Sequence, residues 1–383
     1  MKKTLMVAAL SGLFATAAQA QSSVTLYGLI DAGLTYTNNQ GGSHNFKETS
    51  GSVNGSRWGL RGAEDLGGGL KAIFVLENGF NIGNGQLGQN SREFGRQAFV
   101  GLSSNQYGAV TLGRQYDSMV DYVAPLALTG TQYGGTQFAH PFDNDNLDNS
   151  FRVNNSVKYT SVDYAGFKFG GQYGFSNEAD GFADNRQYSV GASYNYGPLN
   201  IAAGYMQLNN SVTPAGAINN TSGAVAGDNT FVAGLQRTFG AGLNYAFGPA
   251  TVGFVFTQTK LEDASGISGA AVGNGGGTLQ LTDNYARFNN YELNGRYALT
   301  PALSLSGAYT YTDARLDGAK PSFHQFSLQT AYSLSKRTDV YLQGEYVHAI
   351  DLGDSGIGAP INGVGMSSTP NQVSATVGIR HRF

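Results

Sequence analysis

Strict alternation of apolar and polar residues constrains this chain more than any other feature of its sequence. In the last eleven residues, Val373, Val377 and Ile379 share one parity, whereas Thr376 and Arg380 share the other. The same alternation recurs in the segments 167–176, 187–196 and 302–312. Because successive side chains of a strand point to opposite faces, each segment predicts a β-strand with one apolar and one polar face. The fold class is therefore all-β.

The apolar faces are rich in tyrosine and phenylalanine, particularly towards strand ends, as at Phe247, Tyr297 and Tyr346. The chain has 22 tyrosines and 22 phenylalanines but one tryptophan, Trp58. The core of a soluble β-sandwich would instead be dominated by Val, Ile and Leu, whereas aromatic rings favour the interface of a bilayer. After residue 20, no run of apolar residues approaches the ~18 that a transmembrane helix needs. These features favour strands that cross a membrane.

The links between the predicted strands alternate between short and long. The short links are 65–68, 104–108, 163–166, 197–198, 248–249, 300–301 and 335–337. The long links are 37–52, 81–91, 117–151, 178–185, 209–229, 261–285, 313–321 and 351–371. Short periplasmic turns and long external loops are typical of outer-membrane barrels. Counting strands between these links predicts sixteen antiparallel strands.

A sheet of this size must close on itself, because lipid cannot satisfy the hydrogen-bonding groups of an exposed edge. A barrel of sixteen strands leaves a lumen wide enough for water. We therefore expect residues 21–383 to form one transmembrane β-barrel around an aqueous pore for small hydrophilic solutes.

The first twenty residues have the pattern of a signal peptide. Lys2 and Lys3 precede a short apolar run, and Ala18-Gln19-Ala20 matches a small-x-small cleavage site. We therefore expect residues 1–20 to be removed and the mature protein to be exported. The chain contains no cysteine, which excludes disulfides and thiolate chemistry.

Parity assigns most charged residues of the strands to the lumen, because a charge on the lipid face costs about 2–4 kcal/mol near the midplane. The basic residues so placed are Arg57, Arg61, Lys71, Arg96, Lys158, Lys168, Arg296, Arg380 and Arg382. The acidic residues so placed are Asp31, Glu77, Glu292, Asp339 and Glu345. The basic excess predicts a mild preference for anions. Arg114 shares the parity of Val110 and Leu112, so the strand is expected to bend or end there.

The segment 117–151 is longer than an ordinary loop, and loops of this length are usually functional or disordered. It carries several acids, including Asp117 and Asp121, together with apolar residues such as Met119 and Leu126. Two interpretations fit these features. The segment either folds inward and presents its acids to the arginines of the wall, or it remains a solvated external loop.

Other functions have weaker support in the sequence. An enzyme acting through Ser and His would need a histidine beside a nucleophile, and no Gly-x-Ser-x-Gly element occurs among the residues. The run 143–148 is rich in Asp but lacks the glycine and glutamate of an EF-hand, so no metal site is expected. The modest net charge of −3 does not favour a nucleic-acid partner. No cofactor is expected.

A channel specific for one substrate is a closer alternative to a general pore. Sugar channels usually line their path with aromatic surfaces, and Tyr27 and Tyr341 are aromatic residues with lumen parity. They could form a short stacking surface. A soluble adhesin would need repeats and a buried core, neither of which the pattern contains.

Several stretches resemble the trimeric general porins of Gram-negative outer membranes, especially those of beta-proteobacteria. They are Val24–Gly28, Ser56–Leu70, Arg96–Leu102, Leu112–Tyr116, Asn155–Tyr159 and the terminal Phe383. Together they span essentially the whole chain. The resemblance implies a homotrimer of sixteen-stranded barrels in which the third external loop folds into the lumen.

The resemblance also implies a pore constriction with a transverse electric field. The basic cluster of the family maps onto Arg57, Arg96 and Arg152, with Asp117 and Asp121 as the acids of the loop. This chain lacks the Pro-Glu-Phe-Gly-type segment that enteric relatives carry in that loop. Phe383 resembles the signal that the barrel-assembly machinery reads. Outer-membrane lipid and lipopolysaccharide are the other expected partners.

Overall fold

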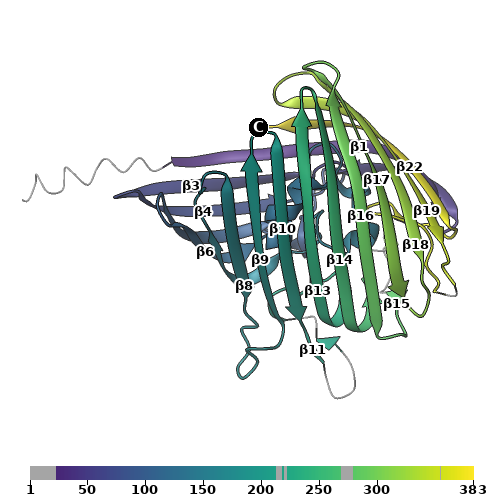
Figure 1. Ribbon diagram of the computed structural model, residues 1–383, viewed down its shortest axis with the longest axis horizontal. Coiled ribbons are helices and arrows are strands. Elements are labelled where there is room, and N and C mark those ends of the chain that lie inside the picture. Colours follow the sequence, from purple (N-terminus) through teal and green to yellow (C-terminus); the bar gives the residue numbers. More distant parts are fainter. Residues whose placement is uncertain (1–22, 213–217, 220–221, 269–278, 354) are drawn as a thin grey trace, which may run out of the picture.

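The computed structural model describes residues 23–212, 218–219, 222–268, 279–353 and 355–383. The predicted signal peptide lies outside the described residues. The described chain forms one large antiparallel sheet that closes into a barrel, with further segments inside it (Figure 1). Within the described ranges, no helix is long and apolar enough to cross a bilayer.

The strands occupy most of the chain. Their bounds are β1 Ser23–Gln40, β2 Ser43–Ser50, β3 Arg57–Gly67, β4 Leu70–Gly79, β5 Gln97–Ser104, β6 Gly108–Gln115, β7 Val153–Thr160, β8 Phe167–Gly174, β9 Arg186–Tyr196, β10 Leu199–Asn209, β11 Ser211–Val212, β12 Ile218–Asn219, β13 Phe231–Phe247, β14 Ala250–Ile267, β15 Leu279–Gln280, β16 Tyr285–Ala298, β17 Leu303–Leu316, β18 Ser322–Ser333, β19 Thr338–Ile350, β20 Pro360–Ile361, β21 Gly365–Met366 and β22 Asn371–Arg382. The helical turns are α2 Gly88–Ser91, η2 Met119–Val123, η3 Ala124–Leu126, η4 Thr136–Phe138 and η5 Pro141–Asp143.

The large sheet contains eighteen of these strands in sixteen positions around the barrel, which confirms the predicted number. Both β2 and β3 pair with β1, one beyond the other, and both β15 and β16 pair with β14. The barrel closes where β1 pairs with β22, from Leu29 opposite Arg382 to Thr37 opposite Ser374. At this seam, Gly28 and Phe383 exchange two backbone hydrogen bonds of 3.1 Å.

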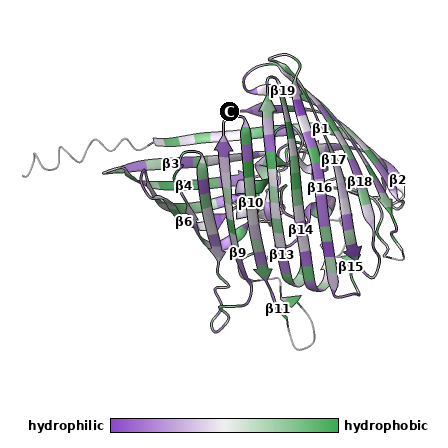
Figure 2. Cartoon of the chain, in the orientation of Figure 1, coloured by the Kyte–Doolittle hydropathy of each residue, from purple (hydrophilic) through white to green (hydrophobic). Residues whose placement is uncertain are grey.

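The apolar faces of the strands point outward, as the alternation predicts. Val24, Leu34 and Val100 are 64%, 65% and 59% exposed on the outer surface. Polar neighbours of opposite parity, such as Thr35 and Thr376, are buried inside. The strands are accordingly banded along their length with hydrophobic and hydrophilic residues (Figure 2). The outer surface therefore suits hydrocarbon.

The short links form tight turns. Gly197-Pro198 joins β9 to β10, and Gly248-Pro249 joins β13 to β14. The two glycines have positive φ angles of 56° and 57°. A two-residue hairpin of type II′ requires a positive φ at its first central residue, and glycine adopts it without strain. Glycine before proline thus sets these two periplasmic turns.

Several long links begin later than predicted, because the strands continue beyond the membrane. β1 extends to Gln40 and β2 starts at Ser43, so most of 37–52 is a hairpin. Likewise, β14 extends to Ile267 and β17 to Leu316. In the external parts of β14 and β17 the inward face carries buried apolar residues such as Leu261, Ile267 and Leu316, so the apolar–polar alternation no longer marks the strand there.

The segment 117–151 folds into the barrel, which decides between the two interpretations of the sequence. Its first turn, η2, packs Met119 and Val123 against the inner wall of β10 and β13. A Cβ atom on Gly240 of β13 would lie 2.6 Å from the Met119 side chain. The absence of a side chain at Gly240 therefore lets the loop approach the wall closely.

A second apolar contact lies inside the external half of the barrel. Phe142 of the inward loop meets Phe288 and Phe323 of the wall, with ring centroids 6.2 and 6.5 Å apart. Residues 357–366, which include β20 and β21, pack against the same group. Inward-facing apolar residues of these strands are thus covered by loops and not exposed to the aqueous lumen.

Candidate pore constriction

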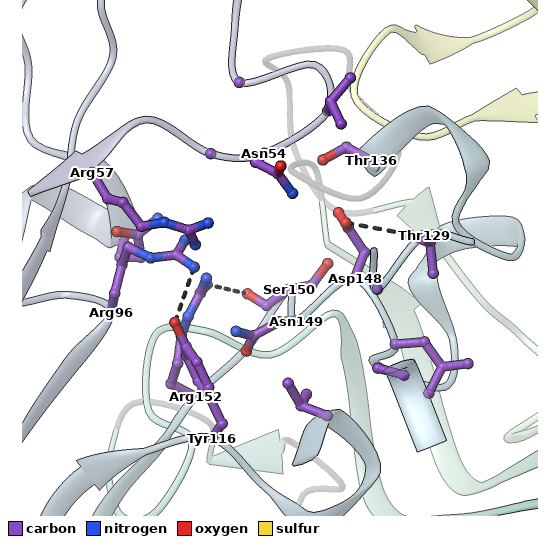
Figure 3. A pocket seen from close by; sticks show the side chains of 18 of the residues that line it. Asn54, Arg57, Arg96, Tyr116, Thr129, Thr136, Asp148, Asn149, Ser150 and Arg152 are labelled. Carbon is purple, nitrogen blue, oxygen red and sulfur yellow. Dashed lines mark hydrogen bonds between the residues drawn. The ribbon is translucent and has the colours of Figure 1, made fainter. Parts of the chain in front are cut away.

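Three arginines from alternate strands lie on one side of a cavity in the lumen (Figure 3). Arg57 is the first residue of β3, Arg96 immediately precedes β5, and Arg152 immediately precedes β7. The cavity has a volume of about 410 Å³ and is bounded opposite the arginines by the inward loop. The structure therefore brings together the three basic residues that the sequence nominated.

Hydrogen bonds fix the middle arginine of this cluster. The Arg96 Nε donates to a Glu77 carboxylate oxygen at 2.7 Å, and its guanidinium also donates to the Tyr116 hydroxyl at 2.9 Å. Glu77 accepts two further hydrogen bonds, from Tyr27 at 2.9 Å and from Tyr116 at 3.0 Å. The guanidinium of Arg152 lies 6.0 Å from the centre of the Tyr116 ring. Glu77 and the tyrosines therefore hold the cluster against the wall.

The cluster keeps an excess of positive charge. In the described part of the chain, no carboxylate lies within 4.0 Å of Arg57 or Arg152. Arg152 donates to the backbone oxygen of Ser150 at 3.4 Å. Because arginine stays protonated in proteins, these guanidinium groups form a fixed positive wall.

Asp148 is the carboxylate of the loop that lines the same cavity. It lies across from the arginines, beside Thr129, Thr136 and Asn54 (Figure 3). Thr129 donates a hydrogen bond of 3.3 Å to it. Burial raises the pKa of Asp148 to about 6, against the opposing effects of hydrogen bonds from Thr136 and Thr129 and of the Arg152 charge. A negative group that titrates near neutral pH thus faces a permanent positive wall.

Asp117 and Asp121, the acids that the sequence nominated for this position, lie elsewhere. Asp117 is fully buried at the start of η2, where it accepts hydrogen bonds of 2.7 Å from the Met119 N–H and the Asn146 side chain. Asp121 pairs with Lys158 on the wall. The loop begins with a helical turn. Asp117 therefore accepts hydrogen bonds from that turn, and Asp121 pairs with a lysine of the wall. Asp148 takes the place opposite the arginines.

The other nominated lumen residues lie outside this cavity. Arg61 lies over the Tyr27 ring at 5.3 Å, and Lys71 is exposed beside the turn between β3 and β4. Lys158 is held by Asp121 and by the Tyr116 carbonyl at 2.9 Å. None of these three residues lines the cavity beside the arginine cluster.

Further basic residues with lumen parity lie near the periplasmic rim. Arg380 and Arg382 both pair with Asp339, at 2.9 and 2.8 Å. Lys168 lies 3.6 Å from Asp163. The guanidinium of Arg296 lies 4.8 Å from the centre of the Tyr133 ring, which belongs to the inward loop.

The two aromatic residues with lumen parity do not form a continuous surface. Tyr341 is 3% exposed and donates a hydrogen bond of 2.6 Å to Asp31. Tyr27 is engaged by Glu77 and Arg61. Both rings are used to fix charged residues of the wall, so neither offers a free face for stacking a sugar.

Sequence reasoning missed the group that fastens the loop to the wall. The two ring nitrogens of His140 lie 2.6 Å from the Asp145 carboxylate and 3.1 Å from that of Glu292, and all three side chains are buried. Burial alone would lower the pKa of His140, but the carboxylates of Asp145 and Glu292 raise it to about 10. Glu292 also accepts a hydrogen bond of 2.9 Å from the Leu128 N–H. The spacing of His140 and Asp145 gives no sign of Glu292, which is distant in sequence.

Arg114, the exception to the parity rule, is turned inward by a bulge. The pairing of β6 with β7 shifts register between Gly113 and Gln115. The guanidinium then reaches Asn154 at 2.5 Å and pairs with Asp228 of the loop between β12 and β13. The expected bend is present, but no pattern in the sequence indicated Asp228 as the partner of Arg114.

Comparisons with known proteins agree with this architecture. A family model described as "Gram-negative porin" matches residues 5–351. An outer membrane porin protein of Bordetella pertussis is 34% identical, and outer membrane porin protein 32 of Delftia acidovorans is 32% identical, each over the full length of both chains. The solved structure of an anion-selective porin from Comamonas acidovorans superimposes with a TM-score of 0.73 at 26% identity, covering 95% of this chain and 100% of that one.

The family match covers most of the sequence, and the relatives match from end to end. The closed barrel, its apolar exterior and the loop inside it are the features expected of such proteins. This confirms the resemblance, the outer-membrane location and the function of a diffusion pore. The chain belongs to the Gram-negative porin family of outer-membrane channel proteins.

Proposed function

We propose that this porin passes ions and small hydrophilic solutes with a preference for anions, and that Arg57, Arg96 and Arg152 set this preference. The observation that carries the proposal is the charge balance of the constriction. Three guanidinium groups line it, and among the described residues only Arg96 has a carboxylate in contact, that of Glu77. Rings of arginine favour anions in a narrow pore.

The position of the cluster makes its charge effective. A charge beside a narrow passage with low-dielectric walls is screened less than one on an open surface. Asp148, on the opposite side, gives the passage a transverse field and reduces its net positive potential. Because Asp148 and Glu77 are two acids beside three arginines, the potential stays positive on balance.

The external loops favour cations over anions. They carry exposed acids such as Asp180 and Asp283, and the whole chain has a net charge of −3. These charges attract cations to the mouth, but salt screens them over about 8 Å at physiological ionic strength. The constriction should therefore dominate selectivity. The related Comamonas porin, at 26% identity, is described as anion-selective.

Reversal potentials in planar bilayers under a salt gradient test this proposal. We expect the native protein to pass chloride in preference to potassium. The triple variant R57Q/R96Q/R152Q should lose that preference, because it removes the fixed positive wall without removing polar side chains. The variant R337Q, which neutralises one exposed arginine at a periplasmic turn, serves as the control. Cation preference of the native protein would refute the proposal.

Assembly as a homotrimer is also a proposal. An apolar groove of about 510 Å³ lies on the outer face of β1, β2, β19 and β22, and residues Leu34, Phe46, Leu342 and Val377 line it. A neighbouring barrel would cover such a face. Conductance steps that arrive in threes in planar bilayers would support the trimer, and steps that arrive singly would contradict it.

Recognition of the C-terminus by the barrel-assembly machinery is a further proposal. Phe383 follows β22 on the outward face, is 42% exposed, and completes the seam with Gly28. Deletion of Phe383 should reduce the amount of folded barrel in the outer membrane. Refolding of the same variant in detergent distinguishes a loss of recognition from a loss of stability.

We propose that passage is passive and that the protein has no catalytic step. The family and the fold are those of a channel. The buried His140 is held between two carboxylates, which suits a structural clamp. Hydrolysis of a lipid or a peptide by the purified protein would contradict this part of the proposal.

A further inference from the structure

Four basic residues form a continuous row across neighbouring strands on the outer face of the barrel. Arg237 of β13 pairs in register with Lys260 of β14, Lys260 pairs with Arg287 of β16, and Arg287 pairs with Arg315 of β17. We call these four residues the basic row. The four strands lie side by side in Figure 1. At a spacing of about 4.8 Å between strands, the row spans about 14 Å.

The basic row faces outward. The residues that flank it along each strand, such as Thr238, Thr259 and Phe288, are buried inside the barrel. The side chains of Arg237 and Arg287 are 44% and 36% exposed, and Arg315 is exposed. These four charges therefore belong to the outer surface and contribute nothing to the lining of the pore.

A row of aromatic residues fixes the height of the basic row in the membrane. Phe256, Tyr291 and Tyr311 occupy adjacent positions on β14, β16 and β17, and Phe239 on β13 lies next to Phe256. The successive ring centroids are 6.4, 5.1 and 6.2 Å apart. Aromatic girdles mark the interfaces of the bilayer.

The basic row lies on the external side of these rings. Lys260 is four residues beyond Phe256 on β14, which is about 13 Å along a strand. Beyond Lys260, β14 leads to one of the long external links. The basic row thus lies at the level of the lipid headgroups of the outer leaflet.

The charges of the row are only partly balanced. Arg237 pairs with Glu262 at 2.9 Å, and Arg287 pairs with Asp313 at 3.2 Å. In the described part of the chain, no carboxylate lies within 4.0 Å of Lys260 or Arg315. The sequence of 269–278, which follows β14, contains no charged residue. Like charges directly opposite each other destabilise a sheet. An external anion bound to the basic row would therefore reduce this repulsion.

We propose that the basic row binds the phosphate groups of lipopolysaccharide in the outer leaflet. Arginine offers paired N–H donors that match a phosphate, and lysine adds a mobile point charge. The aromatic row beneath would contact the acyl chains of the same glycolipid. This inference rests on the outer-membrane location, and it is independent of the proposed selectivity of the pore.

Binding of lipid A to the purified barrel in detergent, followed by native mass spectrometry, tests the inference. The probes are bis-phosphorylated lipid A and dephosphorylated lipid A. The variant K260Q/R315Q removes the two cations that lack a carboxylate partner, so it leaves no acid unpaired. At the usual contribution of a basic residue near an anionic membrane surface, we expect binding of bis-phosphorylated lipid A to weaken about 30-fold.

The matched control is K336Q/R337Q, which removes the same charge from the exposed turn between β18 and β19 on the periplasmic side. It should bind lipid A like the native protein. Equal binding of dephosphorylated lipid A, native-like binding by K260Q/R315Q, or an equal loss in the control would each overturn the inference. So would displacement of lipid A by an equal amount of phosphatidylglycerol, because the row would then be a general site for anionic lipid.

The pore provides a separate readout. K260Q/R315Q should keep the native reversal potential, since its substitutions lie outside the lumen. A barrel that loses lipid A binding and keeps its selectivity supports the inference whatever the sign of that selectivity. Failure of the selectivity proposal is therefore distinguishable from failure of this one.

Discussion

The arginine wall and the loop opposite it use their charged residues differently. On the wall, Arg57 and Arg152 project into the constriction without a carboxylate partner in the described chain. In the loop, Asp117 starts a helical turn and Asp145 holds His140, which leaves Asp148 as the acid that lines the cavity. A regular ladder of backbone hydrogen bonds positions the wall. The loop has no such ladder, so its charged side chains hold the loop itself in place.

This comparison predicts its largest effect at the anchor of the loop. The variant H140A leaves Asp145 and Glu292 buried without their partner, and breaking a buried ion pair of this kind costs about 3–5 kcal/mol. We expect the loop to leave the wall, with a large and noisy change of single-channel conductance. H44A, in the external hairpin of β1 and β2, is the control. Native conductance in H140A would show that apolar packing alone holds the loop.

The carboxylate on the wall should give the next largest effect. E77Q keeps the shape of the Glu77 side chain but removes its charge, so the positive charge of Arg96 is no longer offset. For one screened charge near the passing ion, we expect the ratio of anion to cation permeability to rise about fivefold. Reversal potentials measure this ratio. An unchanged ratio would mean that the wall does not control selectivity.

The loop carboxylate should give a smaller effect that depends on pH. The pKa of Asp148 is raised to about 6, so the group is negative above that pH and neutral below it. As the pH falls through 6, one negative charge opposite the arginines is lost, and the preference for anions should rise about threefold. D148N should show the higher preference at every pH, with no transition near 6. A transition that persists in D148N would assign it to another group.

The acids at the start of the loop should give the smallest effect on selectivity. Asp121 pairs with Lys158 outside the constriction. Neutralising it in D121N should therefore change the reversal potential far less than E77Q or D148N does. A shift as large as that of D148N would indicate that Asp121 faces the arginine cluster, as the sequence analysis predicted.

The wall could be predicted well because its rule is local. Parity with Trp58 and Leu60 is enough to place Arg57 on the inner face, since neighbouring residues of a strand always alternate. The exception at Arg114 was also visible as a conflict of parity, and the structure resolves it with a bulge. The register between strands then brought Arg57, Arg96 and Arg152 together.

The loop could not be predicted in the same way because its contacts are not local. Glu292 meets His140 across 152 residues of chain, and Asp228 meets Arg114 across 114. Nothing periodic connects such partners. The basic row lies between these cases, because parity alone would have placed Arg237 on the outer face, but only the register of four strands shows that it continues through Lys260 and Arg287.

By itself, the sequence determined a sixteen-stranded barrel with an apolar exterior, a charged lumen and short turns on one rim. These properties follow from the two-residue repeat of a strand and from the cost of burying charge in lipid, both of which act within a few residues. Tertiary structure alone decided that Asp148 faces the arginines and that His140 fastens the loop. Such contacts depend on where the closed wall places residues that are distant in the chain.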